Sequence, residues 1–145
     1  MNNIDKWLAT FQRQSEGIHK CIEACKADNH DMQCEKCHLW HDDTGCEAFG
    51  LDYTEIRKLH ALLTEAEIPH TFRVHLGGYQ VCYPEYDDRV CSAVLHGHSY
   101  GAFEGEIEIM GLLTPEEEEI SDVCGDLTAD DVFNRIRKHW EEQKK

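Results

Sequence analysis

Five of the eight cysteines of this chain lie between Cys21 and Cys46, and their spacing is that of a metal site. Cys34 and Cys37 form a Cys-x-x-Cys pair, a tight turn from which two thiolates reach one ion from the same side. Cys25 lies nine positions before this pair, and Cys46 lies nine positions after it. Four thiolates satisfy the tetrahedral coordination of Zn²⁺. The sequence therefore predicts a structural zinc site made by Cys25, Cys34, Cys37 and Cys46.

Three further residues could replace one of these ligands. Cys21 precedes Cys25 by four positions, so the two thiols share one face of a helix. His38 and His41 follow the Cys-x-x-Cys pair and offer imidazole nitrogens, which zinc also accepts. A thioredoxin-type redox pair would follow a strand and open a helix, whereas this pair follows the polar loop DNHDMQ. The amino-terminal stretch MNNIDKWLAT lacks the apolar region of a signal peptide, which favours the cytosol and reduced cysteines.

The elements that must position the cysteines follow from the apolar periodicity. An amphipathic helix is predicted over about residues 3 to 27, with Cys25 on its apolar stripe. The other members of this stripe are Ile4, Leu8, Phe11, Ile18 and Ile22. Asp52 and Glu55 resemble a capping box and predict a second helix that reaches Ala66. The two helices would enclose the segment between them, which carries Cys34, Cys37 and Cys46 and is called the cysteine loop here.

Alternation replaces helical spacing after Thr71 and predicts a β-hairpin over residues 70 to 84, with Gly77-Gly78 as its turn. The segment RVCSAVLH predicts a third strand, and GEIEIMG allows a fourth. Thr114 and Thr128 predict the starts of two further helices. The predicted fold class is α+β. Residues 1–51 form an N-terminal helical zinc-bound module, and residues 52–145 form a domain with a small antiparallel sheet of three or four strands covered by helices.

Composition limits the classes of partner. The net charge is −15, from 29 acidic and 14 basic side chains, which disfavours binding to a nucleic-acid backbone. A zinc knuckle for nucleic acid would need basic residues between its ligands, whereas Asp42, Asp43 and Glu47 surround Trp40 in this loop. No apolar run reaches the length of a membrane helix. The acidity suits a basic protein partner, and the sequence leaves a homo-oligomer open.

Cationic and aromatic residues after Thr71 predict a second site, for an anionic ligand. Arg73 and His75 share one face of the hairpin, and His96 and His98 alternate in the segment HGHSYG. The full predicted ligand-binding set is Arg73, His75, Arg89, His96, His98 and Tyr100. A glycine-rich turn and a solvated sheet face are the competing interpretations of these residues.

Catalytic motifs are missing from the sequence, which contains neither a P-loop nor GxGxxG. Cys91 with His96 or His98 has the residue types of a Cys–His pair. The apolar neighbours Val90 and Ala93 favour a buried structural cysteine instead. We therefore predict a binding protein without catalytic residues and keep a small Cys/His enzyme as an alternative.

Four segments after Leu51 carry a family resemblance: IPHTFRVHLGGYQVCYP, RVCSAVLHGHSYG, EIEIMGLLTPEEEE and LTADDVFNRIRKHW. They resemble small uncharacterised accessory proteins encoded by phages and prophages of Gram-positive bacteria. The front half is similar to short cysteine-cluster proteins of phage genomes, which often have a proline where this chain has His38.

This resemblance implies a protein of the host bacterial cytoplasm that counters antiviral defence. It would act as a binder, which either sequesters a small nucleotide immune signal or inhibits a host defence protein. A zinc-stabilised nucleic-acid-associated or regulatory phage protein is the alternative. The resemblance implies no catalytic residues.

Overall fold

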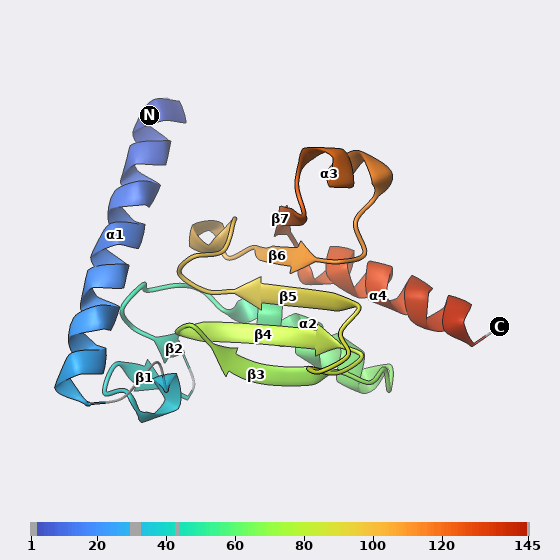
Figure 1. The fold of residues 1–145 in the computed structure, drawn as a ribbon, viewed down its shortest axis with the longest axis horizontal. Coiled ribbons are helices and arrows are strands. Elements are labelled where there is room, and N and C mark those ends of the chain that lie inside the picture. Colours follow the sequence, from blue (N-terminus) through green and yellow to red (C-terminus); the bar gives the residue numbers. More distant parts are fainter. Residues whose placement is uncertain (1–2, 30–32, 43, 145) are drawn as a thin grey trace.

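The computed structural model describes residues 3–29, 33–42 and 44–144. A long helix, a short cysteine loop and an α+β unit follow one another along the chain (Figure 1). The helices are α1 (Asn3–Ala27), α2 (Thr54–Glu65), α3 (Pro115–Ile120) and α4 (Ala129–Gln143), with the 3₁₀ turns η1 (Cys34–Lys36) and η2 (Ala102–Glu104). The strands are β1 (Trp40–His41), β2 (Gly45–Cys46), β3 (Thr71–His75), β4 (Gly78–Tyr83), β5 (Cys91–Leu95), β6 (Ile107–Met110) and β7 (Val123–Leu127).

Strands β3 to β7 form one antiparallel sheet in which each strand pairs with the next along the chain. Helices α2 and α4 cover one face of this sheet, behind the strands in Figure 1. Their apolar sides meet alternate sheet residues in a single buried core. This core includes Ile56, Leu59, Leu63, Val81, Tyr83, Leu95, Ile107, Ile109, Val132 and Ile136. The predicted α+β class is confirmed.

The predicted strand number is wrong, because the sheet has a fifth strand, β7. Its sequence, VCGDL, carries a glycine and an aspartate, two residues that are depleted in strands. Asp126 has a positive φ of 59°, and the β6–β7 register shifts between Ile107 and Ile109. Pairing with β6, and not local preference, makes this segment a strand.

The helix bounds follow the sequence closely at three of the four helices. Helix α1 covers the predicted residues, and capping boxes at Thr114 and Thr128 open α3 and α4. Helix α2 differs, because Asp52 and Glu55 do not form the predicted capping box. The Asp52 carboxylate accepts from the Thr54 N–H at 3.0 Å, while the Glu55 carboxylate accepts from the Ala129 N–H at 2.8 Å. Glu55 therefore ties the start of α4 to α2.

The predicted hairpin is confirmed, but its turn lies one residue earlier. His75 pairs with Gly78, so the two turn residues are Leu76 and Gly77. Both have positive φ values, 48° and 79°, as a type I′ turn requires. Leucine rarely adopts this conformation, so contacts from elsewhere in the chain must hold the turn.

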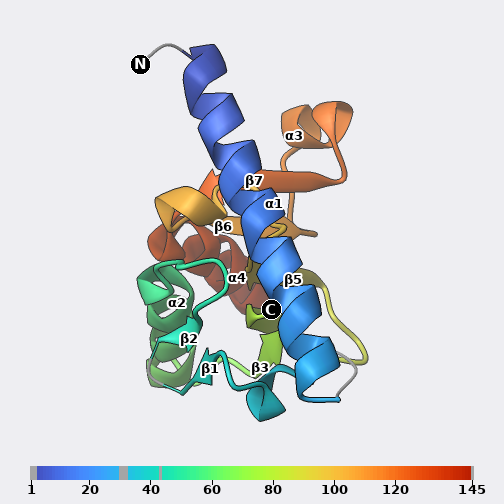
Figure 2. The ribbon, with the colours of Figure 1, turned by 90° about the vertical axis from the view of Figure 1, so that its left-hand side faces the viewer.

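The first half of α1 extends beyond the rest of the chain (Figures 1 and 2). Its apolar stripe is consequently exposed, with Ile4 69% and Phe11 55% accessible. The helix meets the body near Gly17, where an added Cβ would clash with the ring of Phe49, and near Ile18. Among the described residues, no helix has the length and apolarity needed to cross a bilayer. The predicted division of the chain at residue 51 stays a prediction.

Candidate metal centre and the neighbouring sheet face

Three of the predicted metal-binding sulfurs accept hydrogen bonds from backbone N–H groups. The Cys34 Sγ accepts from Gly77 at 3.1 Å, and the Cys46 Sγ accepts from Ala48 at 3.4 Å. The Cys37 Sγ accepts from Leu39. Burial raises the pKa of all three thiols, and these hydrogen bonds oppose that rise because they favour the thiolate. Thiolates are the form of cysteine that binds metal.

All five cysteines of the loop region lie close enough to interact electrostatically. Burial, followed by the neighbouring Cys25, Cys46 and Cys34, raises the pKa of Cys21 to about 12. After burial, Cys25 likewise raises the pKa of Cys34. For Cys37, burial, then Asp28 and then Cys25 raise the pKa. None of the eight cysteines of the chain is paired in a disulfide. A cation among these sulfurs would offset the mutual repulsion of their thiolates.

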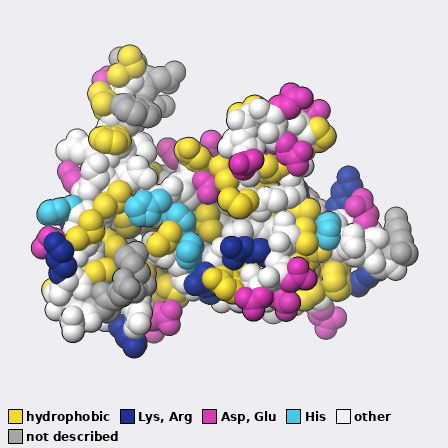
Figure 3. All heavy atoms as spheres, viewed as in Figure 1, with side chains coloured by type: hydrophobic (Ala, Val, Ile, Leu, Met, Phe, Trp, Pro, Cys, Tyr) yellow, Lys and Arg dark blue, Asp and Glu magenta, His cyan; other side chains and the backbone are white. Residues whose placement is uncertain are grey.

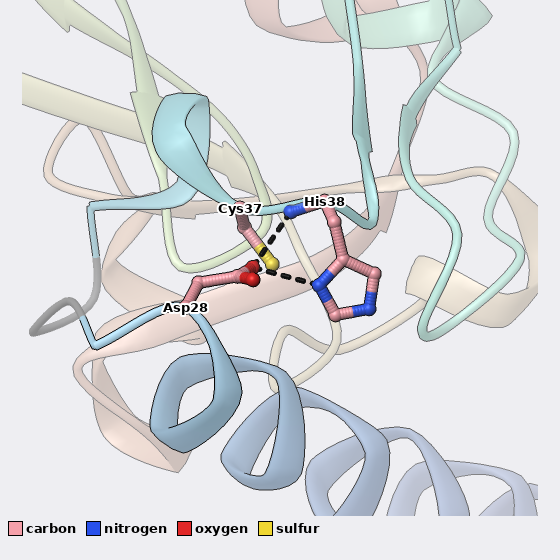
Figure 4. A group of neighbouring side chains, drawn as sticks. All are labelled: Asp28, Cys37 and His38. Carbon is pink, nitrogen blue, oxygen red and sulfur yellow. Dashed lines mark hydrogen bonds and ion pairs between the residues drawn. The ribbon is translucent and has the colours of Figure 1, made fainter.

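Asp28, Cys37 and His38 form a group of metal-ligating side chains whose ligand atoms lie within 4.8 Å of one another (Figure 4). The Asp28 carboxylate contacts the His38 Nδ1 at 2.7 Å and accepts from the His38 N–H at 2.8 Å. These bonds lower the pKa of Asp28. His38 was predicted as an alternative ligand, whereas Asp28 was missed because an aspartate just after a helix end has no distinctive pattern.

His41, the other predicted alternative, points to a different partner. Its Nε2 lies 2.6 Å from the Glu47 carboxylate, and both side chains are at least half exposed. The strands that carry these residues are only two residues long, and β1 pairs with β2 through Trp40 and Cys46. This pairing brings Cys46 back toward Cys34 and Cys37.

The cysteine loop packs against the turn of the β3–β4 hairpin. Besides the Gly77 N–H bond to Cys34, the Gly77 carbonyl accepts from the Tyr53 hydroxyl at 2.9 Å. A Cβ on Gly77 would lie 3.4 Å from the Cβ of Cys46. Trp40 packs edge-on against Tyr79, with ring centroids 5.6 Å apart. Both polar backbone groups of Gly77 are thus held from outside the hairpin.

The second predicted site lies on the face of the sheet opposite α2 and α4. A polar row crosses three strands there, with Arg73 Nη1 donating to Gln80 at 2.6 Å and Gln80 donating to Ser92 at 2.8 Å. Tyr86, from the loop after β4, lies between two guanidinium groups, 4.6 Å from Arg73 and 5.2 Å from Arg89. Within the described part of the chain, neither arginine forms an ion pair with a carboxylate.

Histidines continue this face toward the cysteine loop and α1. The rings of His75 and His96 are 5.4 Å apart, and those of His96 and His98 are 5.9 Å apart. Burial, and then the two neighbouring histidines, lower the pKa of His96 to about 4. The His96 Nδ1 accepts from the His98 N–H, so the ring is neutral and carries its proton on Nε2. Histidine and basic side chains lie next to each other on this face in Figure 3.

Burial, followed by Arg73 and Arg89, lowers the pKa of His75. The structure thus brings Arg73, His75, Arg89 and His96 together, with His98 beside them. Tyr100 does not join them. It is 66% exposed and borders, together with His98, a second hollow of about 240 Å³ against Phe11 and Gln14 of α1.

Tyr86 was not among the predicted ligand-binding residues, because residues 84–88 have the composition of a polar connection between strands. Cys91 lies in the core, on the face opposite His96, and burial raises the pKa of Cys91 to about 12. Cys91 and His96 therefore do not form a pair.

Comparison of the chain with known family models, with curated proteins and with solved structures found no match.

Proposed function

We propose that this protein is a non-catalytic binder that takes an anionic ligand on the open face of its sheet and is stabilised by one structural zinc ion. The observation that carries the proposal is the position of Tyr86 between Arg73 and Arg89. In a chain with 29 acidic side chains, neither guanidinium has a carboxylate partner among the described residues. Unpaired arginines held in place by an aromatic ring favour an anion from outside the chain.

A nucleotide is the ligand class that fits these groups best. Guanidinium groups bind phosphate in a bidentate manner, and neutral imidazoles such as His96 donate hydrogen bonds without adding charge. The half-exposed ring of Tyr86 on the same face supplies a surface on which a base can stack. The biological role we propose is sequestration of a nucleotide immune signal by a phage protein in the host cytoplasm. Inhibition of a host defence protein is the second form of this proposal.

The zinc ion would be bound by Cys25, Cys34, Cys37 and Cys46. Three of these sulfurs already accept N–H bonds, which support bound thiolates. Asp28 and His38 lie beside Cys37 and could either orient the cysteine ligands or replace one of their sulfurs at the zinc. The role proposed for the zinc is structural, because the buried cluster of this loop is small, namely Cys46, Ala48 and Phe49.

Ligand binding is tested by thermal shift and calorimetry with cyclic nucleotides, ADP-ribose derivatives and inorganic phosphate. We expect at least one nucleotide to stabilise the protein, and Arg89→Ala to abolish the effect. Arg137→Ala is the matched control, because Arg137 also lies over an aromatic ring, 5.5 Å from Phe133, but on α4 behind the sheet. No binding by any nucleotide would overturn the sequestration proposal.

A denaturation experiment separates a binder from an enzyme. A binder returns its nucleotide unchanged when the complex is heat-denatured, whereas an enzyme returns products. Chromatography of the released material distinguishes the two. Altered nucleotide in the wild-type sample, but not in buffer, would contradict the non-catalytic proposal.

A further inference from the structure

A cleft of about 430 Å³ lies between the cysteine loop and strand β3. One wall is η1, which contributes Lys36 and the metal-site residue Cys34. The other wall is β3, which contributes Arg73 and His75. This volume is in the range of small-molecule sites. The cleft therefore joins the two candidate sites into one continuous feature.

The charge of this cleft suits an anion. Lys36, like Arg73, forms no ion pair among the residues that the structure describes. Glu35 also lines the cleft and is the one acidic side chain among the described residues that line it. Two fixed cations and an imidazole thus face one carboxylate, in a molecule whose net charge is −15. Such a local excess of positive charge can bind an anion in spite of the overall charge.

The position of the β3 wall depends on the cysteine loop. Leu76, next to His75, has a φ of 48°, and this conformation is costly for a leucine. Two contacts with Gly77 hold the turn from outside, namely the N–H bond to Cys34 and the carbonyl bond from Tyr53. The local sequence alone would not keep this turn, so these contacts set where His75 and Arg73 lie.

We propose that metal binding by the cysteine loop forms this cleft, and that the protein takes a phosphate-bearing ligand there only when the loop is loaded. A bound metal would tie Cys34 to the rest of the cysteine loop and so fix the η1 wall that carries Lys36. Because the Cys34 sulfur also accepts from the Gly77 N–H, the same anchor holds the turn that leads into the β3 wall. This inference rests on the proposed function and adds a regulator to the same site.

The first test compares zinc-loaded, zinc-stripped and zinc-restored protein, with ADP and inorganic pyrophosphate as calorimetric probes. We expect the affinity of the stripped protein for the probes to be lower by about tenfold or by a larger factor. Added zinc should restore the affinity. Equal affinity in the loaded and stripped forms would overturn this inference and leave the proposed function intact. If no form binds either probe, the anion site itself is wrong, and both proposals fail.

A second variant tests the coupling without removing metal. Tyr53→Phe deletes the hydroxyl that binds Gly77, and Tyr53 is neither a predicted metal ligand nor a residue that lines the cleft. We expect unchanged zinc content and an affinity for ADP lowered by about threefold to tenfold, the effect of one lost hydrogen bond. Tyr83→Phe is the matched control, because it deletes a buried tyrosine hydroxyl that contacts His139 of α4. Equal affinity of Tyr53→Phe and wild type would contradict the role of the turn.

Discussion

The sulfur of Cys34 accepts a hydrogen bond from the N–H of Gly77 at 3.1 Å, across 43 positions of sequence. This bond joins the cysteine loop to the turn of the β3–β4 hairpin, two residues from His75. It therefore places a predicted metal ligand close in the fold to a predicted ligand-binding residue.

We expect purified protein to contain about one zinc ion per chain, since a Cys-x-x-Cys pair with two further cysteines at this sequence spacing can bind zinc tightly as thiolates. Cys37→Ser should lower the zinc content to near zero and destabilise the loop. Metal analysis by mass spectrometry measures both. Cys124→Ser is the control, because Cys124 lies outside the loop and contacts Glu117. Protein prepared without chelator that contains no metal would refute the site.

Asp28→Asn should weaken zinc binding by about tenfold, because the carboxylate that orients His38 beside Cys37 is neutralised. Competition with a coloured chelator measures the change in affinity. Glu23→Gln, which removes one negative charge from the last turns of α1, should have no effect. If both variants bind zinc like the wild type, Asp28 has no role at the metal.

Stability should fall as the pH falls from about 6.5 to about 4, because unfolded His96 takes up a proton in this range while folded His96 stays neutral. Its lowered pKa corresponds to a loss on the order of 3 kcal/mol across this window. His75 contributes in the same direction. Urea unfolding at several pH values measures the slope.

His96→Gln is the comparison for this pH dependence, because it removes the titrating ring and also cancels any shared effect of metal loss at low pH. The free energy of unfolding of this variant should decline less steeply over the same range. Parallel pH profiles for the variant and the wild type would show that His96 does not titrate as expected.

Salt dependence tests the second form of the proposed function, the inhibition of a host defence protein. If the acidic surface binds a basic host protein, association should slow sharply between about 0.05 and 0.5 M salt, because the Debye length falls below about 10 Å. Stopped-flow or surface-binding kinetics measure the rate. Association that does not change with salt would instead indicate an apolar interface.

Local signals in the sequence determined many of the elements. The bounds of α1, the caps at Thr114 and Thr128 and the pairing of β3 with β4 depend on neighbouring residues, so periodicity and capping patterns were sufficient. The spacing of Cys34 and Cys37 indicates a metal in the same way, because a gap of two residues is enough to define a turn that directs both sulfurs to one side. These features involve contacts over a few positions, where the chain itself sets the geometry.

Tertiary structure decided the features that depend on distant partners. Strand β7 exists because β6 offers it hydrogen bonds, and Leu76 takes a positive φ because Cys34 and Tyr53 hold Gly77. The placement of Tyr86 between two arginines required β3 and the loop after β4 to meet. The apolar stripe of α1 shows the same limit, because amphipathic spacing predicts a face to be buried but does not supply the surface that covers it.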